Sequence, residues 1–249
     1  MIIYIKSKEE IEMFKKAGRQ TAELLSKLID AVEEGMTTED LDMLSRQLCN
    51  FDGSKLAFLN YEGFPHGICT SVNEVLVHGT ANKTKLKNGD ILSIDVGVEH
   101  EGYIGDTAET VIVGNSPSHI VDKCREALNK GIEKAVPGNK ISDISSAIYK
   151  VAKLSTFSLP LDYGGHGINR HCLHADPFVP NMPDFSDDLT LRPGMVLAIE
   201  PMLVDSVHGG TSVDKDGWSV VAAGLSAHCE HTILVTESKP FILTRRDNE

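Results

Sequence analysis

The chain has 249 residues, of which 41% are hydrophobic and 24% charged, the balance of an ordinary globular protein. Its formal net charge of −12 argues against DNA binding, because phosphate contacts need clustered Lys and Arg. The five cysteines form no C-x-x-C pair, no apolar run is long enough to span a membrane, and the apolar N-terminus is too short for a signal peptide. We therefore expect a cytoplasmic protein with free thiols.

Two helices are predicted at the start of the chain. Ser7 and Glu10 form an S-x-x-E capping box, so the first helix is expected to begin after Ser7. Apolar residues follow at mostly helical spacing, and Gly35 is the expected stop. The second helix is expected to begin after Thr37 or Thr38.

A similar arrangement recurs in the second half of the chain. Ser118 precedes another amphipathic segment. The pair Gly35 and Asp40 recurs 103 residues later as Gly138 and Asp143. This weak internal repeat predicts two similar halves, each built from helices and strands.

Strands are predicted between and after these helices. Residues 91–98 and 103–113 are expected to form a hairpin with its turn near His100, Glu101 and Gly102. Further strands are expected at 195–199, 232–236 and 241–244. No linker interrupts the pattern, so we expect one α+β domain over residues 1–249.

Acidic residues stand inside two of these apolar segments. Asp95 lies in ILSIDVGV and Glu200 in VLAIEPML. An ionised carboxylate in an apolar interior needs a partner or a metal ion. A buried Arg or a turn contact would explain either acid alone. A shared cation would explain both.

The hairpin brings a third acid into the same region. If its turn centres on His100 and Glu101, Asp106 lies directly opposite Asp95, with Cβ atoms about 4.5–5.5 Å apart. Like charges at that distance repel, and a divalent cation between them removes the repulsion. A register slip of one residue would place the two acids on opposite faces.

Histidines supply the other ligand type. His166 lies in GGHGI, which we interpret as a glycine-rich loop, and His78, His171 and His174 are further candidates. A lone His is more often a surface or core residue than a ligand. Imidazole and carboxylate together are typical ligands of Zn, Mn, Fe and Co. A pair of ions about 3.5–4 Å apart can activate water and polarise a carbonyl.

Five short segments in order resemble the type I methionine aminopeptidases, and the resemblance covers nearly the whole chain. It implies the pita-bread α+β fold, two pseudo-symmetric halves around a curved, largely antiparallel sheet. It also implies that the segments hold two divalent ions (Co, Mn, Fe or Zn). The implied ligands are Asp95 in SIDVG, Asp106 in GDTA, His166 in GHGI, Glu200 in AIEP and Glu230 in CEHT.

The resemblance implies a reaction and a substrate as well. Members remove the initiator methionine from nascent proteins, with a metal-bridging water as nucleophile and the acid at Glu200 moving its proton. His78 and His174 match the histidines that contact the substrate. The methionine pocket is implied at Tyr61, Phe64, Cys69 and Trp218, with Phe58 and Leu173 expected nearby; ordinary core packing is the alternative for each.

Two departures from the family pattern bear on the site. His166 and His174 are eight residues apart where seven is usual, which makes His171 a rival for the substrate role. We prefer His174 because it begins an H-x-x-P segment. His228 stands where Gln is common. These changes affect pocket shape and rate more than metal binding.

Other functions and partners stay open at this point. The alternatives are an Xaa-Pro peptidase of the same fold, which normally carries a further N-terminal domain, a slow divergent paralogue, and a non-enzymatic binding protein, which would be expected to lose ligands. The lysines in residues 83–87 are interpreted as a solvated turn or as a ribosome-docking patch. We expect a monomer that acts on the N-termini of nascent chains.

Overall fold

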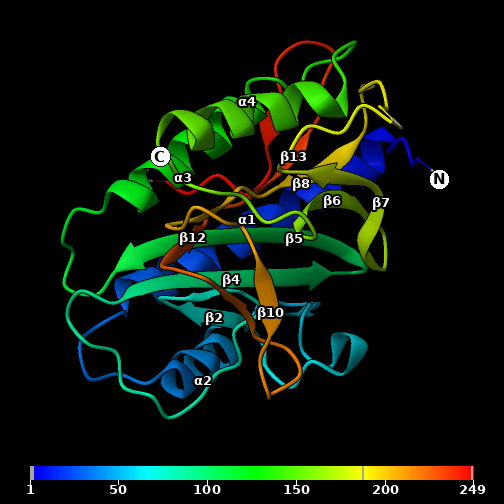
Figure 1. Ribbon diagram of the computed structural model, residues 1–249. Coiled ribbons are helices and arrows are strands. Elements are labelled where there is room, and N and C mark those ends of the chain that lie inside the picture. The colour runs from blue at the N-terminus through cyan, green and yellow to red at the C-terminus, as the bar shows by residue number, and fades with distance from the viewer. Residues whose placement is uncertain (1–2, 187, 248) are drawn as a thin grey trace.

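Two pairs of helices cover antiparallel sheets in the computed structural model, which describes residues 3–186, 188–247 and 249 (Figure 1). The helices are α1 (Lys8–Asp30), α2 (Thr38–Leu48), α3 (His119–Ile132) and α4 (Ile141–Leu154). The strands are β1 (Ser54–Leu56), β2 (Cys69–Val72), β3 (Val75–Val77), β4 (Ile91–His100), β5 (Tyr103–Ile112), β6 (Gly164–Asn169), β7 (Cys172–Pro180), β8 (Val196–Ile199), β9 (Met202–Val204), β10 (Thr211–Val213), β11 (Val220–Ala222), β12 (Ser226–His228), β13 (His231–Leu234) and β14 (Phe241–Ile242), and a short 3-10 turn, η1, spans Tyr61–Gly63.

The helix starts follow from their caps. The Ser7 hydroxyl accepts a hydrogen bond from the Glu10 backbone N–H, and the Glu10 carboxylate accepts one from the Ser7 backbone N–H, which confirms the first predicted start. Thr37 caps α2 in the same way, which decides between the two predicted starts. The predicted stop was wrong by a few residues, because α1 ends at Asp30 and Gly35 lies in the following turn with φ 88°.

The predicted repeat has a structural counterpart. Helix α2 begins at Thr38 and α4 at Ile141, 103 residues later. Helix α2 follows α1, and α4 follows α3 in the same way. Each pair of helices lies beside its own sheet (Figure 1). The expectation of two similar α+β halves is therefore confirmed.

Two larger sheets carry the core. The first has the order β1-β4-β2 with β5 paired to β4, and the second has the order β14-β13-β8-β6-β7, all pairs being antiparallel. Helix α1 runs behind the long β4–β5 hairpin, while α3 and α4 lie above the hairpin in the view of Figure 1 and contact β8 and β7 of the second sheet. The predicted strands near residues 195, 232 and 241 are confirmed as β8, β13 and β14. Within the described ranges, no helix is long and apolar enough to cross a membrane.

The hairpin turn is centred one residue later than predicted, which shifts the pairing register by two residues. His100 pairs with Tyr103, so the turn is only Glu101 and Gly102, with φ of 50° and 90°. Positive φ at both central residues is the geometry of a tight two-residue hairpin turn, which follows the right-handed twist of the strands.

This shorter turn changes which residues face Asp95 and Asp106. Asp106 pairs with Gly97, and Asp95 pairs with Ala108, so the prediction that the two acids are directly opposed was wrong. A shift of two residues preserves the face, because side chains alternate with a period of two. The acids are diagonal neighbours on one face of the sheet.

The segment around His166 is a strand and not the predicted loop. Its glycines serve close strand packing: a Cβ on Gly165 would lie 2.2 Å from the Ala198 carbonyl oxygen, and one on Gly167 would lie 2.1 Å from the Asp176 carbonyl oxygen. The sequence alone does not reveal such backbone neighbours, so the glycine-rich composition was interpreted as a loop. Here it places the His166 backbone directly against β8.

The close packing of β6 gives the first testable prediction. Gly165→Ala is expected to lower the free energy of unfolding by about 1–3 kcal/mol, because the new methyl group overlaps the β8 backbone. Gly210→Ala is the matched control, since nothing lies within 4 Å of the added Cβ. Equal midpoints for the two variants in denaturant titrations would contradict this packing.

Candidate active site

One pocket collects all five predicted metal ligands. Asp95 comes from β4, Asp106 from β5 and His166 from β6, while Glu200 directly follows β8 and Glu230 directly precedes β13. All five positions belong to different strands of the two larger sheets or directly adjoin their ends. The site therefore lies where the two halves of the molecule meet.

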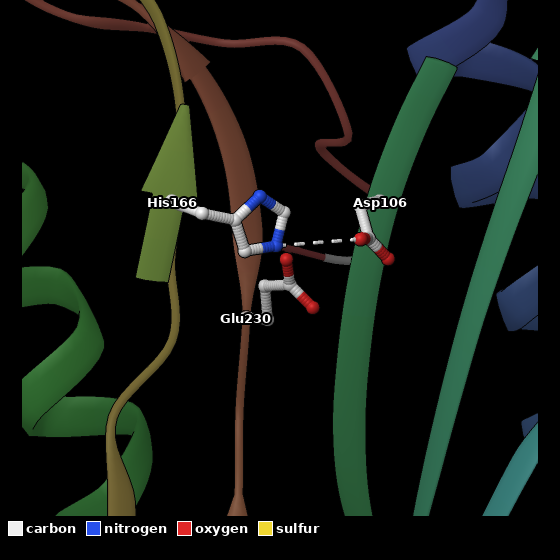
Figure 2. A group of neighbouring side chains, drawn as sticks. All are labelled: Asp106, His166 and Glu230. Atoms are coloured by element: carbon white, nitrogen blue, oxygen red, sulfur yellow. Dashed lines mark ion pairs between the residues drawn. The ribbon is translucent and has the colours of Figure 1, made fainter. Parts of the chain in front are cut away.

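Asp106, His166 and Glu230 point toward one another (Figure 2). One ligand atom from each lies within 4.8 Å of the others. His166 Nε2 is 3.8 Å from Asp106 Oδ2 and 3.4 Å from Glu200 Oε1. The other ring nitrogen, Nδ1, lies 3.1 Å from the Gly167 carbonyl oxygen, which leaves Nε2 to face the acids.

Hydrogen bonds between β5 and the segment entering β13 hold this arrangement. The Glu230 N–H donates to the Ala108 carbonyl at 2.9 Å, and the Thr107 hydroxyl donates to the Glu230 carbonyl at 2.6 Å. The Thr232 hydroxyl accepts from the Asp106 N–H at 2.9 Å and donates to the Asp106 carbonyl at 2.7 Å. Asp106 and Glu230 are thus fixed by the backbone of both strands.

The acids are buried without enough partners. Asp106 is 3% exposed, Glu230 2% and Glu200 8%. Among the described residues, Asp95 Oδ1, Asp106 Oδ1 and Glu230 Oε1 find no hydrogen-bond donor. Unpaired carboxylate oxygens are costly in a protein interior, so the set needs positive charge. A divalent cation with carboxylate and imidazole ligands fits this donor set.

Burial also changes how these acids hold protons. Loss of hydration raises the pKa of Asp95 to about 7 and the pKa of Asp106, Glu200 and Glu230 well above the usual range. The neighbouring carboxylates raise the pKa of Asp106 and Glu230 further. Without a cation, the cluster binds protons in its place.

His78 directly follows β3. Its φ is 57°, an uncommon left-handed conformation for a residue with a side chain. Burial, with His174 and His228 nearby, lowers the pKa of His78 to about 4. The ring is therefore neutral near pH 7 and can offer an N–H donor into the pocket it lines.

The structure separates the two rival histidines. The His174 ring lines the pocket, 4.5 Å from the His166 ring and 5.3 Å from the Tyr61 ring. His171 is exposed on the β6–β7 turn, where its backbone N–H donates to the Gly102 carbonyl at 2.7 Å. The β6–β7 register shifts next to His166, and this irregularity accommodates the unusual spacing.

An apolar wall completes the pocket. Phe64 and Trp218 meet edge to face, with ring centroids 5.3 Å apart. Burial raises the pKa of the Cys69 thiol well above its usual range, which argues against a nucleophilic role. The predicted wall residues all line this one pocket: Phe58, Tyr61, Phe64, Cys69, Leu173 and Trp218.

Asp216 holds the turn that presents Trp218. Its Oδ1 accepts from the backbone N–H groups of Trp218 and Ser219, both at 2.9 Å. Its Oδ2 accepts from the hydroxyl groups of Thr80 at 2.6 Å and Ser219 at 2.5 Å. Because Thr80 lies two residues after His78, this carboxylate ties the aromatic wall to the histidine segment.

Two residues near the site were not among the predicted site residues, although His228 was noted as a departure from the family pattern. Glu62 is exposed and lines the pocket beside Tyr61. His228 is 2% exposed, and its Nε2 lies 3.3 Å from Glu200 Oε2. In the sequence, His228 could have been found from its position two residues before the predicted ligand Glu230. Glu62 could have been found only from its position next to the predicted pocket residue Tyr61.

Comparisons with known proteins agree with this geometry. A model of metallopeptidase family M24 matches residues 12–237. A methionine aminopeptidase of Aquifex aeolicus is 42% identical over 258 residues, covering 98% of this chain and 99% of the relative. The crystal structure of methionine aminopeptidase from Rickettsia prowazekii superposes with a TM-score of 0.94 at 38% identity, covering 98% of this chain and 100% of that one.

A more distant structure shows the shared fold alone. Prolidase from Pyrococcus furiosus superposes with a TM-score of 0.78 at 24% identity, covering 98% of this chain and 66% of the prolidase. The pita-bread fold is thus confirmed, as is the resemblance to methionine aminopeptidases. With its buried acid and imidazole cluster in one pocket, the chain belongs to metallopeptidase family M24.

Proposed function

We propose that this chain is a metal-dependent methionine aminopeptidase, with residues 1–249 forming one catalytic domain. It removes an N-terminal methionine from nascent proteins and peptides when the next side chain is small. The observation that carries this proposal is the joining of five candidate metal ligands and an apolar wall in one pocket. The relatives from Aquifex aeolicus and Rickettsia prowazekii, 42% and 38% identical and both named methionine aminopeptidase, support the same activity.

Two divalent ions, of Co, Mn, Fe or Zn, are the proposed cofactors. Asp95, Asp106, His166, Glu200 and Glu230 would hold them, since their oxygen and nitrogen atoms converge and several lack other partners. Bound there, the ions would supply a water nucleophile at neutral pH and would polarise the scissile carbonyl. Asp95 lies outside the closest group of three ligand atoms but lines the same pocket.

The charge of the pocket explains a preference for free N-termini. None of its described lining residues is Lys or Arg, and Glu62 is an acid outside the proposed ligand set, so that the ions would not neutralise it. A substrate ammonium group gains from such surroundings, whereas an internal peptide bond has no such group. The apolar wall would take the side chain of the same N-terminal methionine, on the amino-terminal side of the scissile bond.

Three side chains would act directly on the reacting groups. Glu200 would accept a proton from the attacking water and deliver it to the leaving amine, a task that suits a buried carboxyl with a raised pKa. The His78 ring, neutral near pH 7, would donate a hydrogen bond from its N–H to the substrate carbonyl oxygen. His174, beside His166 and Tyr61, would contact the peptide at the pocket mouth.

Further properties of the protein stay predictions. A monomeric state is the default expectation, and the cytoplasmic location rests on the sequence argument. In residues 83–87 the lysines are exposed and Leu86 is buried, which suits the solvated turn. A ribosome contact through these lysines is the second reading of the same segment.

Peptide specificity tests the proposed function. The metal-loaded protein is expected to release methionine from Met-Ala peptides and not from Met-Leu peptides, as the resemblance to methionine aminopeptidases implies. A chelator is expected to abolish release, and added metal to restore it. Mass spectrometry of the products measures this. Efficient cleavage of Xaa-Pro substrates would instead favour a prolidase-type enzyme.

Substitutions in the pocket test the proposed roles. Asp106→Asn and Glu200→Gln are expected to lower kcat/KM at least about 100-fold while circular dichroism shows an unchanged fold. His174→Ala is expected to lower kcat/KM as well, and His171→Ala, the matched surface control, to leave it unchanged. Loss in the His171 variant with full activity in the His174 variant would reverse the assignment.

Metal binding is expected to release protons. Because the pKa of the acids is raised in the metal-free folded chain, they are protonated there and must ionise to bind a cation. For the same reason, the metal-free fold loses stability as the pH rises from the unfolded pKa of a carboxyl through the folded pKa, about 7 for Asp95.

Calorimetry in buffers of different ionisation enthalpy measures this release. More protons are expected at about pH 6 than at about pH 8, together with weaker apparent affinity at the lower pH. A proton count near zero at both pH values would show that the acids are already ionised in the metal-free protein.

A further inference from the structure

His228 is a buried imidazole with one nitrogen left unpaired. The residue is 2% exposed, and its Nε2 has no hydrogen-bond partner among the described residues. The same atom lies 3.3 Å from Glu200 Oε2, without the orientation of a hydrogen bond. A buried polar atom in this state calls for a ligand, an ion or a water.

The backbone fixes the direction of this ring. His228 ends β12, where it pairs with Met202 of β9. The backbone N–H of His228 donates to the Thr110 hydroxyl at 2.9 Å, and that hydroxyl donates to the backbone carbonyl of His228 at 2.6 Å. His228 is thereby bound to β5, the strand that carries Asp106. The approach of its ring to Glu200 follows from the framework of the site.

Glu200 faces two imidazoles with its two oxygens. Oε1 lies 3.4 Å from His166 Nε2, and Oε2 lies 3.3 Å from His228 Nε2. Two ligand atoms about 2.0–2.1 Å from one tetrahedral ion are about 3.4 Å apart, so both separations suit a shared cation. A nitrogen of His228 and carboxylate oxygens of Glu200 and Glu230 all lie within 4.8 Å of one another.

Glu230 connects this second group to the first. It belongs both to the set with Asp106 and His166 and to the set with Glu200 and His228. All three residues of the second set are buried, so an ion there would be shielded from water like one in the first set. The two groups are adjacent parts of one centre.

We propose that His228 is a metal ligand, which with Glu200 and Glu230 forms a second subsite of this centre. The inference rests on the proposed metal-dependent function, and it adds an imidazole to the ligand set implied by the resemblance, where His166 is the sole one. A second imidazole shifts the preference of the centre toward Zn, Co and other nitrogen-binding ions and away from Mg and Mn.

The competing role for His228 is a hydrogen bond to Glu200 that only orients the carboxylate. Affinity alone does not separate the two roles, because loss of such an outer contact also weakens metal binding about 10–100-fold. The number of imidazoles bound to the ions separates them, since an orienting residue adds none.

X-ray absorption at the zinc edge counts these imidazoles. The full chain would be freed of metal, loaded with two equivalents of Zn²⁺ and checked for stoichiometry by elemental analysis. We expect two imidazole ligands per protein in the unaltered chain, and one in His228→Gln and in His166→Gln. His171→Gln, the matched surface control, should keep two. Circular dichroism would establish that each variant is folded.

The count in the unaltered chain decides even if a variant fails to fold. A single imidazole per protein, or an equal count in the unaltered chain and His228→Gln, would overturn the inference. Methionine release with only one imidazole would leave the proposed function standing. Two imidazoles without any methionine release would leave the subsite standing and defeat the function.

Discussion

The structure depends on the burial of four carboxylates around one point. Asp95, Asp106, Glu200 and Glu230 repel one another there, and burial removes the water that would otherwise stabilise their charges. Protons or cations are the two ways to neutralise them. Much of the surrounding framework, such as the Thr107 and Thr232 hydroxyl bonds, holds the acids together against this repulsion.

The two halves of the fold make such a cluster possible. Each half presents a sheet, and the site lies where β4 and β5 of the first meet the strands of the second (Figure 1). Strands position side chains more rigidly than loops do, which keeps the acids close despite their charge. The irregular parts of the pocket, the η1 turn and the turn at Trp218, contribute to its apolar wall.

Much of this could be predicted from the residues because acids inside apolar strands have few explanations. The face shared by Asp95 and Asp106 was correct, but their direct opposition was not, since a two-residue turn with positive φ at Glu101 has no strong signal in the sequence. The strand at His166 was missed because its glycines are required by close contacts with the backbone of other strands, which the sequence does not reveal. The contact of His228 with Glu200 is equally non-local, so only its unusual residue type marked it.

Anomalous diffraction from crystals soaked in Mn²⁺ or Zn²⁺ tests the central claim most directly, because it locates cations without reference to activity. The account predicts strong peaks between Asp106, His166 and Glu230, within bonding distance of their side chains (Figure 2). A fully soaked crystal with no peak in this pocket, and with the carboxylates still in place, would show that protons or water alone stabilise the buried acids.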